Sequence, residues 1–168
     1  MFRVSPRVTL RLLALGSAVG ACALVLGSSA SAQGSATLTF KELNTGSTLP
    51  FVDSAPLSKA KGEPTASLGD RIVFTNPLVS AAGKHVGRLY LHCTVVVAAP
   101  QANRAAFACE GVIALGGGTL AVQTLLLRAG ATVNGIVTGG TGTYANARGT
   151  LRSRPTKTGA DDTITLVA

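Results

Sequence analysis

The sequence KHVGRLYLHCTVVV (84–97), the turn AAPQANR (98–104) and AAFACEGVIAL (105–115) together predict an antiparallel hairpin. In the first stretch, the odd positions from 87 to 97 read Gly, Leu, Leu, Cys, Val and Val. The even positions from 88 to 94 read Arg, Tyr, His and Thr. Side chains of a strand point alternately to opposite faces, so one face of this hairpin is apolar. An antiparallel sheet that is buried on one face and solvated on the other produces this pattern.

Two cysteines of this hairpin fall opposite each other. Folding about residue 101 places Cys93 against Cys109 and Leu91 against Gly111. Directly opposed residues lie about 4.5–5.5 Å apart, a distance that a disulfide spans. The hairpin therefore predicts a Cys93–Cys109 disulfide, with two buried free thiols as the alternative.

Strand-like segments follow one another along most of the chain, and no stretch shows sustained helical periodicity. Eight strands are predicted, at residues 36–44, 69–76, 84–97, 105–115, 119–128, 132–138, 144–153 and 163–167. Turns are predicted between them, at 77–83, 116–118, 129–130, 139–142 and 155–162. Several short strands separated by glycine-rich turns are typical of an all-β sandwich or barrel.

The first 32 residues have the composition of a secretory signal peptide. Three arginines among the first eleven residues precede an apolar run (12–26), and the small-residue sequence ASA (30–32) suits a cleavage site. We therefore expect an exported protein whose mature chain, residues 33–168, forms one domain. Cys22 leaves a lipid-anchored protein as a less favoured alternative, because the apolar run continues beyond it.

The composition restricts the partners of the mature chain. The net charge of the whole sequence is +8, and it falls to +5 in the mature chain, which lacks the three arginines of residues 1–32. Nucleic acid is not expected, since five Phe and two Tyr leave few stacking platforms and no basic helix is evident. No second apolar stretch is long enough to cross a bilayer, so the mature form is not expected in a membrane. The sequence leaves the oligomeric state open.

No metal or cofactor site is predicted. His85 and His92 are seven residues apart on one strand and so point to opposite faces, and no Cys, His or Asp cluster has ligand spacing. The glycine-rich runs at 116–118 and 139–142 do not precede a predicted helix, as a phosphate-binding loop would. Asp161 and Asp162 fall in the predicted turn 155–162, where we expect them to be solvated.

Three polar residues lie on faces that are otherwise apolar. Within TLTFKELN (37–44), Glu42 and Asn44 share a face with a leucine and a phenylalanine, and Asn76 shares a face with Phe74. Buried polar groups cost free energy unless they are hydrogen-bonded or line a wet cavity. A carboxyl in an apolar cavity tends to have a raised pKa, and it can act as a base or stabilise a cation. Alternatively, these groups lie near strand ends and bond the backbone.

The same alternation assigns eight apolar side chains to the interior of the molecule. They are Leu38, Phe40, Ile72, Phe74, Leu89, Leu91, Phe107 and Ile113. A slip of one residue in any strand would place its interior set on the outside, so this assignment also predicts the register.

Five motifs together resemble the allene oxide cyclase and dirigent protein superfamily. They are ELN (42–44) followed by Pro50, LGDRIVFTNPL (68–78), GRLYLHCTVV (87–96), LAVQ (120–123) and VTGGTGTYANARGTL (137–151). The resemblance implies an eight-stranded antiparallel β-barrel with a central apolar cavity. For the plant cyclases it further implies a stereospecific ring closure of an unstable epoxide without a cofactor.

The resemblance also implies roles for individual residues. Matching by motif makes Glu42 the group that stabilises developing positive charge, and it makes Asn44, Asn76 and Pro50 the groups that position a water on the epoxide oxygen. Leu49 stands where the family has a serine. We expect the ligand to contact Phe40, Phe74 and Leu91 in the cavity wall.

We therefore expect an exported barrel that binds a small hydrophobic ligand and guides a cofactor-free cyclisation or isomerisation. One alternative is a dirigent-type module that orients reactive ligands made by another enzyme. Another is a secreted binding or structural protein whose interior is filled by side chains. Cavity volume separates these, because pockets for such ligands usually measure about 300 Å³ or more.

Overall fold

The computed structural model describes residues 35–54 and 65–167. The predicted signal peptide, including Cys22, lies outside the described residues. The strands are β1 (Ala36–Leu43), β2 (Phe51–Val52), β3 (Arg71–Val79), β4 (His85–Val97), β5 (Ala106–Leu115), β6 (Gly118–Leu126), β7 (Val133–Gly140), β8 (Arg148–Pro155) and β9 (Gly159–Val167). Short 3-10 helices lie at η1 (Ala102–Arg104) and η2 (Gly142–Tyr144).

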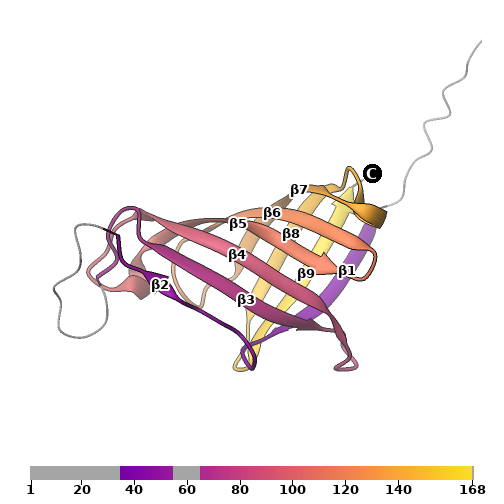
Figure 1. Cartoon of the computed structure of the whole chain (residues 1–168), viewed down its shortest axis with the longest axis horizontal. Helices are drawn as coiled ribbons and strands as arrows, with labels where there is room; N and C mark the ends of the chain where they lie inside the picture. The colour runs from indigo at the N-terminus through magenta and orange to yellow at the C-terminus, as the bar shows by residue number, and fades with distance from the viewer. Residues whose placement is uncertain (1–34, 55–64, 168) are drawn as a thin grey trace, which may run out of the picture. The chain divides into compact units, whose positions relative to one another are not determined.

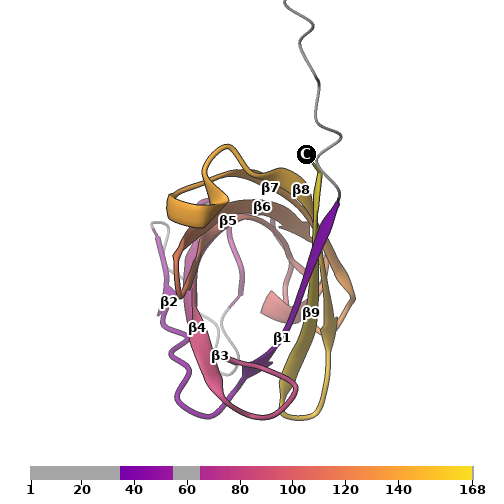
Figure 2. The same ribbon diagram turned by 90° about the vertical axis from the view of Figure 1, so that its right-hand side faces the viewer.

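All nine strands belong to one antiparallel sheet in the order β1-β9-β8-β7-β6-β5-β4-β3-β2. Because β1 also pairs with β3, the eight longer strands close into a barrel, whose ring is visible in Figure 2 and whose staggered strands are visible in Figure 1. The two-residue strand β2 pairs with β3 beyond the end of that closure. The predicted eight-stranded antiparallel β-barrel is thus confirmed, and β2 is an addition that the sequence did not indicate.

The central hairpin has the predicted register. Cys93 pairs with Cys109 and Leu91 pairs with Gly111 across β4 and β5. The two cysteines form a disulfide, with their Cα atoms 4.0 Å apart. The prediction from the folded hairpin is therefore confirmed.

The interior is divided between a packed core and a space left open. The packed part contains nine buried apolar side chains from eight strands: Phe40, Leu78, Leu89, Ile113, Leu120, Val122, Val137, Leu151 and Ile164. A second cluster, around the disulfide, includes Val95 and Phe107. All eight side chains assigned to the interior by alternation are buried or half-buried and belong to these clusters or pack against them.

One predicted turn is part of a strand. β3 continues past Pro77 to Val79, although the sequence suggested a turn over 77–83. Proline cannot donate a ladder hydrogen bond and is therefore found where one side of a strand has no partner. On that side of β3, the pairing with β1 begins only at Leu78, so Pro77 is tolerated.

Two boundaries near the C-terminus also differ from the prediction. β8 begins at Arg148 rather than at Tyr144, because residues 142–144 form η2 and Asn146 adopts a left-handed conformation with φ of 63°. The predicted turn 155–162 shrinks to three residues, since β9 begins at Gly159. This extension of β9 places Asp162 within the strand.

The disulfide is expected to stabilise the barrel mainly by restricting the unfolded chain. The two cysteines are 16 residues apart in sequence. A loop of about 15 residues corresponds to about 3 kcal/mol in the chain-entropy model. Reduction should therefore lower the free energy of unfolding by about that amount, measured by guanidinium denaturation with and without a reductant. A Cys93→Ala/Cys109→Ala variant is the control, and its denaturation curve should not respond to reductant. Equal stability of oxidised and reduced protein would contradict the prediction.

Candidate functional site

A cavity of about 580 Å³ occupies the part of the barrel interior that the packed core leaves open. Its wall is mostly apolar and draws on β1 and on all the strands from β3 to β9, together with neighbouring loops. The volume exceeds the roughly 300 Å³ that small-molecule sites usually need. A barrel filled completely by its own side chains is therefore not what the structure shows.

The structure brings most of the predicted site residues to this cavity. Glu42, Asn44 and Asn76 line it, as do Phe74 and Leu91. Two predicted residues lie elsewhere: Phe40 is part of the packed core, and Pro50 is exposed and not part of the lining. The carbonyl of Pro50 instead accepts a hydrogen bond from the amide of Val73.

Glu42 and Asn76 are in direct contact across the seam that closes the barrel. Glu42 pairs with Leu78 between β1 and β3, and Asn76 lies two residues before Leu78, on the same face of β3. The Asn76 Nδ2 atom donates a hydrogen bond of 2.7 Å to Glu42 Oε2. The amide therefore orients the carboxylate within the cavity wall.

Asp162 is a third acidic or amide group at this point, and sequence reasoning missed it. The expectation that it is solvated in a turn was wrong: it lies within β9, opposite Phe40 of β1 and Ser153 of β8, and only 4% of it is exposed. Asp161 beside it is exposed, as expected. The available signal was alternation, since Asp162 is two residues before the fully buried Ile164 and must share its face.

Burial raises the pKa of Asp162 to about 8. The Glu42 carboxyl adds to this rise by charge repulsion and by hydrogen bonding, whereas a hydrogen bond with Ser153 opposes it and Asp161 adds a further repulsion. Asp162 is therefore protonated at neutral pH. Among the described residues its Oδ1 atom has no hydrogen-bond partner.

A glycine permits the close approach of β9 to β1 at this point. Gly159 pairs with Leu43, and a Cβ atom on Gly159 would collide with the main-chain oxygen of Glu42. A larger residue would push the two strands apart next to the carboxyl pair. Gly159 thus helps to hold Glu42 and Asp162 within reach of each other.

A second buried aspartate shows what a fully bonded carboxylate looks like in this protein. Asp70 accepts hydrogen bonds from the amide and hydroxyl of Ser67 and from the amide of Ser54. Burial by itself raises the pKa of Asp70, but these hydrogen bonds outweigh it and lower the pKa. Asp70 therefore fixes the loops around it, whereas Asp162 keeps an unsatisfied oxygen and a raised pKa.

The disulfide also borders the cavity. Cys93 and Cys109 both contribute to its lining. Because their sulfur atoms are joined, Cys93 has no free thiol to act on a ligand. Its contribution to the wall is one of shape and rigidity.

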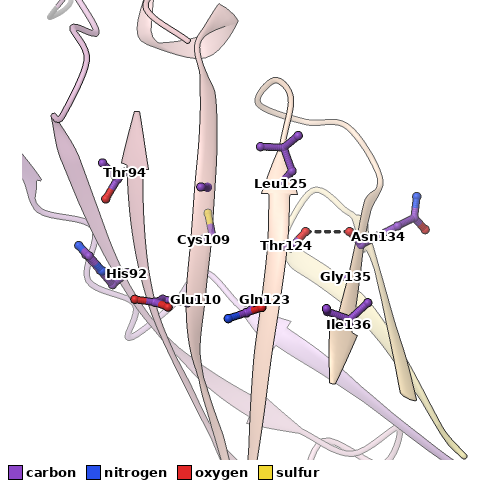
Figure 3. A pocket seen from close by; sticks show the side chains of 11 residues that line it. His92, Thr94, Cys109, Glu110, Gln123, Thr124, Leu125, Asn134, Gly135 and Ile136 are labelled. Carbon is purple, nitrogen blue, oxygen red and sulfur yellow. Dashed lines mark hydrogen bonds between the residues drawn. The ribbon is translucent and has the colours of Figure 1, made fainter. Parts of the chain in front are cut away.

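A second pocket, of about 690 Å³, lies on the outside of the barrel (Figure 3). Most of its side chains come from the outward face of β4 to β7, where His92, Glu110, Gln123 and Ile136 are neighbours across the strands. The dashed line in Figure 3 joins the Thr124 hydroxyl to the carbonyl of Asn134. This groove is bordered by one face of one sheet, whereas the interior cavity is surrounded by strands, so the interior is the stronger candidate site.

Neither a metal centre nor a membrane-spanning helix is found in the part of the chain that the structure describes. No three His, Cys, Asp or Glu residues of that part are grouped to hold a metal ion. No helix of that part is long and apolar enough to span a membrane.

The raised pKa of Asp162 gives a prediction for stability. An aspartate in the unfolded chain has a pKa near 3.8, so between there and about 8 the folded protein holds a proton that the unfolded chain has released. In this window the free energy of unfolding therefore falls as the pH rises, because the folded protein binds a proton at Asp162 that the unfolded chain does not. We expect Asp162→Asn to gain free energy of unfolding over the wild type as the pH rises, by on the order of a few kcal/mol by about pH 9.

Chemical denaturation of both proteins from about pH 4 to 9 measures this difference. Asp161→Asn is the matched control, because it removes a neighbouring carboxylate on the exposed side of β9. Its stability should follow that of the wild type closely, because the repulsion from Asp161 is the smallest of the causes that act on the pKa of Asp162. Parallel curves for Asp162→Asn as well would refute the raised pKa.

Comparison with known proteins agrees with the fold. A family model for the allene oxide cyclase barrel-like domain matches residues 53–166. No curated protein matches the chain. Among solved structures, a pyocyanin demethylase is 26% identical with a TM-score of 0.64, and the match covers 79% of this chain and 100% of that one.

Two further structures show the same fold at lower identity. One is a nonspecific haem-binding cyclase that catalyses a [4 + 2] cycloaddition in neoabyssomicin biosynthesis, at 16% identity and a TM-score of 0.56, covering 81% of this chain and 65% of that one. The other is a pterocarpan synthase dirigent protein, at 18% identity and a TM-score of 0.50, covering 79% and 80%. The match over residues 53–166 and the closed barrel show that this chain belongs to the allene oxide cyclase barrel-like family.

Proposed function

We propose that the protein is an exported enzyme that binds one small, largely apolar molecule inside its barrel and guides an isomerisation or ring closure by proton transfer. The observation that supports this most is a protonated carboxyl next to a second carboxyl within an apolar cavity. Such a pair supplies a proton donor and a proton acceptor at one place. Neither role requires a cofactor.

The proposed chemistry divides the work between the two carboxyl groups. Glu42, oriented by Asn76, accepts a proton from one atom of the bound molecule. Asp162 delivers its proton to a second atom, so that a double bond shifts or a ring closes while the number of protons on the molecule stays constant. The apolar wall excludes water and strengthens both electrostatic effects. Asn44, which lines the same cavity, is a further polar group for orienting the ligand.

The comparisons support a small-molecule role without defining the reaction. The pyocyanin demethylase, whose name makes pyocyanin its substrate, is matched over its full length. The cyclase and the dirigent protein share only the fold with this chain at their level of identity. Pyocyanin is accordingly the first compound to test, followed by small polycyclic molecules of similar size.

The export of the protein is part of this proposal and is tested separately. The basic and apolar composition of residues 1–26 and the ASA sequence at 30–32 support it. We expect protein recovered outside the cytoplasm to begin at Gln33, measured by intact mass and N-terminal sequencing. Protein that retains Met1, or that carries lipid on Cys22, would contradict this processing.

The role of Glu42 is tested by Glu42→Gln, which keeps the size of the side chain and removes its charge. We expect turnover of the substrate to fall by about 10²–10³-fold, the scale for losing one preorganised catalytic group. The measurement is product formation followed by liquid chromatography and mass spectrometry, starting with pyocyanin. Asp161→Asn removes a carboxylate outside the cavity and should keep full turnover.

Access to the cavity is tested in the same assay with two neighbouring residues of β4. Leu91→Trp should block the reaction because Leu91 lines the cavity, whereas Tyr90→Trp should not, because Tyr90 is exposed on the outer face. Full turnover in Leu91→Trp would place the reaction outside the barrel. Full turnover in Glu42→Gln would remove the central residue of the proposal.

A further inference from the structure

The ionisable groups of the cavity are all acidic. Its described lining contains the carboxyl groups of Glu42 and Asp162 and no Lys, Arg or His side chain. The other polar groups of the lining are the neutral side chains of Asn44, Asn76, Asn103, Thr124 and Ser153. The sequence as a whole is strongly basic, with 15 Lys and Arg against 7 Asp and Glu, so the acidic interior is opposite in sign to the rest of the chain.

One of the two carboxyl groups lacks a complete set of partners. Glu42 accepts its hydrogen bond from Asn76, whereas Asp162 Oδ1 has none among the described residues, although 96% of this residue is buried (4% exposed). A buried polar atom without a partner is costly, and a hydrogen bond or a charge from a bound molecule offsets that cost. Because Asp162 lines the cavity, a bound molecule is in a position to supply that donor or a positive charge.

Aromatic rings form part of the same wall. Phe51, Phe74 and Phe107 line the cavity, and they are three of the five phenylalanines in the sequence. The face of an aromatic ring attracts organic cations, and the attraction increases when water is excluded. The wall thus combines aromatic surface with negative charge.

We propose that the cavity selects an organic cation, a small and largely apolar molecule whose single positive charge lies against Glu42 and Asp162. A charged nitrogen in an aromatic ring system has this chemistry. The inference rests on the proposed function, since it assigns a charge to the ligand of that same site. It also excludes a class of ligand: a carboxylate, such as a fatty acid, would meet two carboxyl groups and no basic side chain in the described wall.

The charge of the ligand is tested with three tricyclic compounds of nearly equal size. They are 10-methylacridinium, which is a permanent cation, acridine, which is uncharged at slightly alkaline pH, and acridine-9-carboxylate, which is an anion. Their dissociation constants for the wild-type protein are measured from fluorescence titrations. We expect the cation to bind at least about tenfold more tightly than acridine, and the carboxylate to bind most weakly.

Variants of the wall show whether the preference arises at the carboxyl pair. Glu42→Gln should reduce the preference for the cation over acridine severalfold, because it removes the carboxylate that Asn76 holds in the cavity wall, whereas the exposed control Asp161→Asn should keep it. Leu91→Trp should weaken the binding of all three compounds, because the larger side chain takes up part of the cavity. The wild-type titrations alone decide the sign of the preference, even if a variant folds poorly.

The outcomes separate this inference from the proposed function. Equal affinities for the cation and acridine, or tightest binding of the carboxylate, would overturn the charge preference. If the compounds bind without a preference for the cation, and if Leu91→Trp weakens their binding, the cavity remains a ligand site and the proposed function stands. Binding of none of the three compounds would count against both.

Discussion

Two residue pairs between β1 and β3 close this barrel, and the rest of the structure depends on them. Without the pairs Lys41–Val79 and Glu42–Leu78, β1 would be an open edge of the nine-stranded sheet, and the C-terminal end of β3, which β2 does not reach, would be open as well. The closure is short because the two antiparallel strands overlap only at their C-terminal ends, where β1 ends at Leu43 and β3 ends at Val79. Glu42 is one of the four residues that close the barrel. Asn76, which donates a hydrogen bond to its carboxylate, lies on β3 just outside the pairing with β1. A site formed at a seam has polar groups available that a continuous ladder would bury.

The two buried aspartates show how the same residue type serves two purposes. Asp70 has three hydrogen bonds from Ser54 and Ser67 and stabilises local structure. Asp162 has the Glu42 carboxyl beside it and keeps a free oxygen, so its burial is unfavourable for folding. Proteins depart from full polar satisfaction mainly at functional sites, where the loss of stability is compensated elsewhere. In this chain the disulfide and the packed core around Ile113 and Leu120 are the compensation nearest to the cavity.

Much of the fold follows from local sequence pattern. The hairpin of β4 and β5 has strong alternation and a defined turn, so its register and the Cys93–Cys109 disulfide were predictable from short-range information. The same alternation placed Glu42 and Asn76 on the interior face. Asp162 was missed because the preceding residues resemble a turn, and β9 extends there only through its pairing with β1 and β8. Strand ends that depend on partners distant in sequence are not encoded locally, and the same reason explains the extension of β3 through Pro77.

The topology has a consequence for when the site comes into existence. The strands from β3 to β9 each pair with the next along the chain, so that meander assembles from short loops, whereas β1 joins β9 at the opposite end of the chain. Contacts between distant segments cost the most loop entropy and tend to form late in folding. Glu42 is on β1 and Asp162 is on β9, so the two carboxyl groups meet only when β1 has paired with β9. We therefore expect a partly folded chain to contain the disulfide and most of the apolar wall, but to have no activity until β1 pairs with β9.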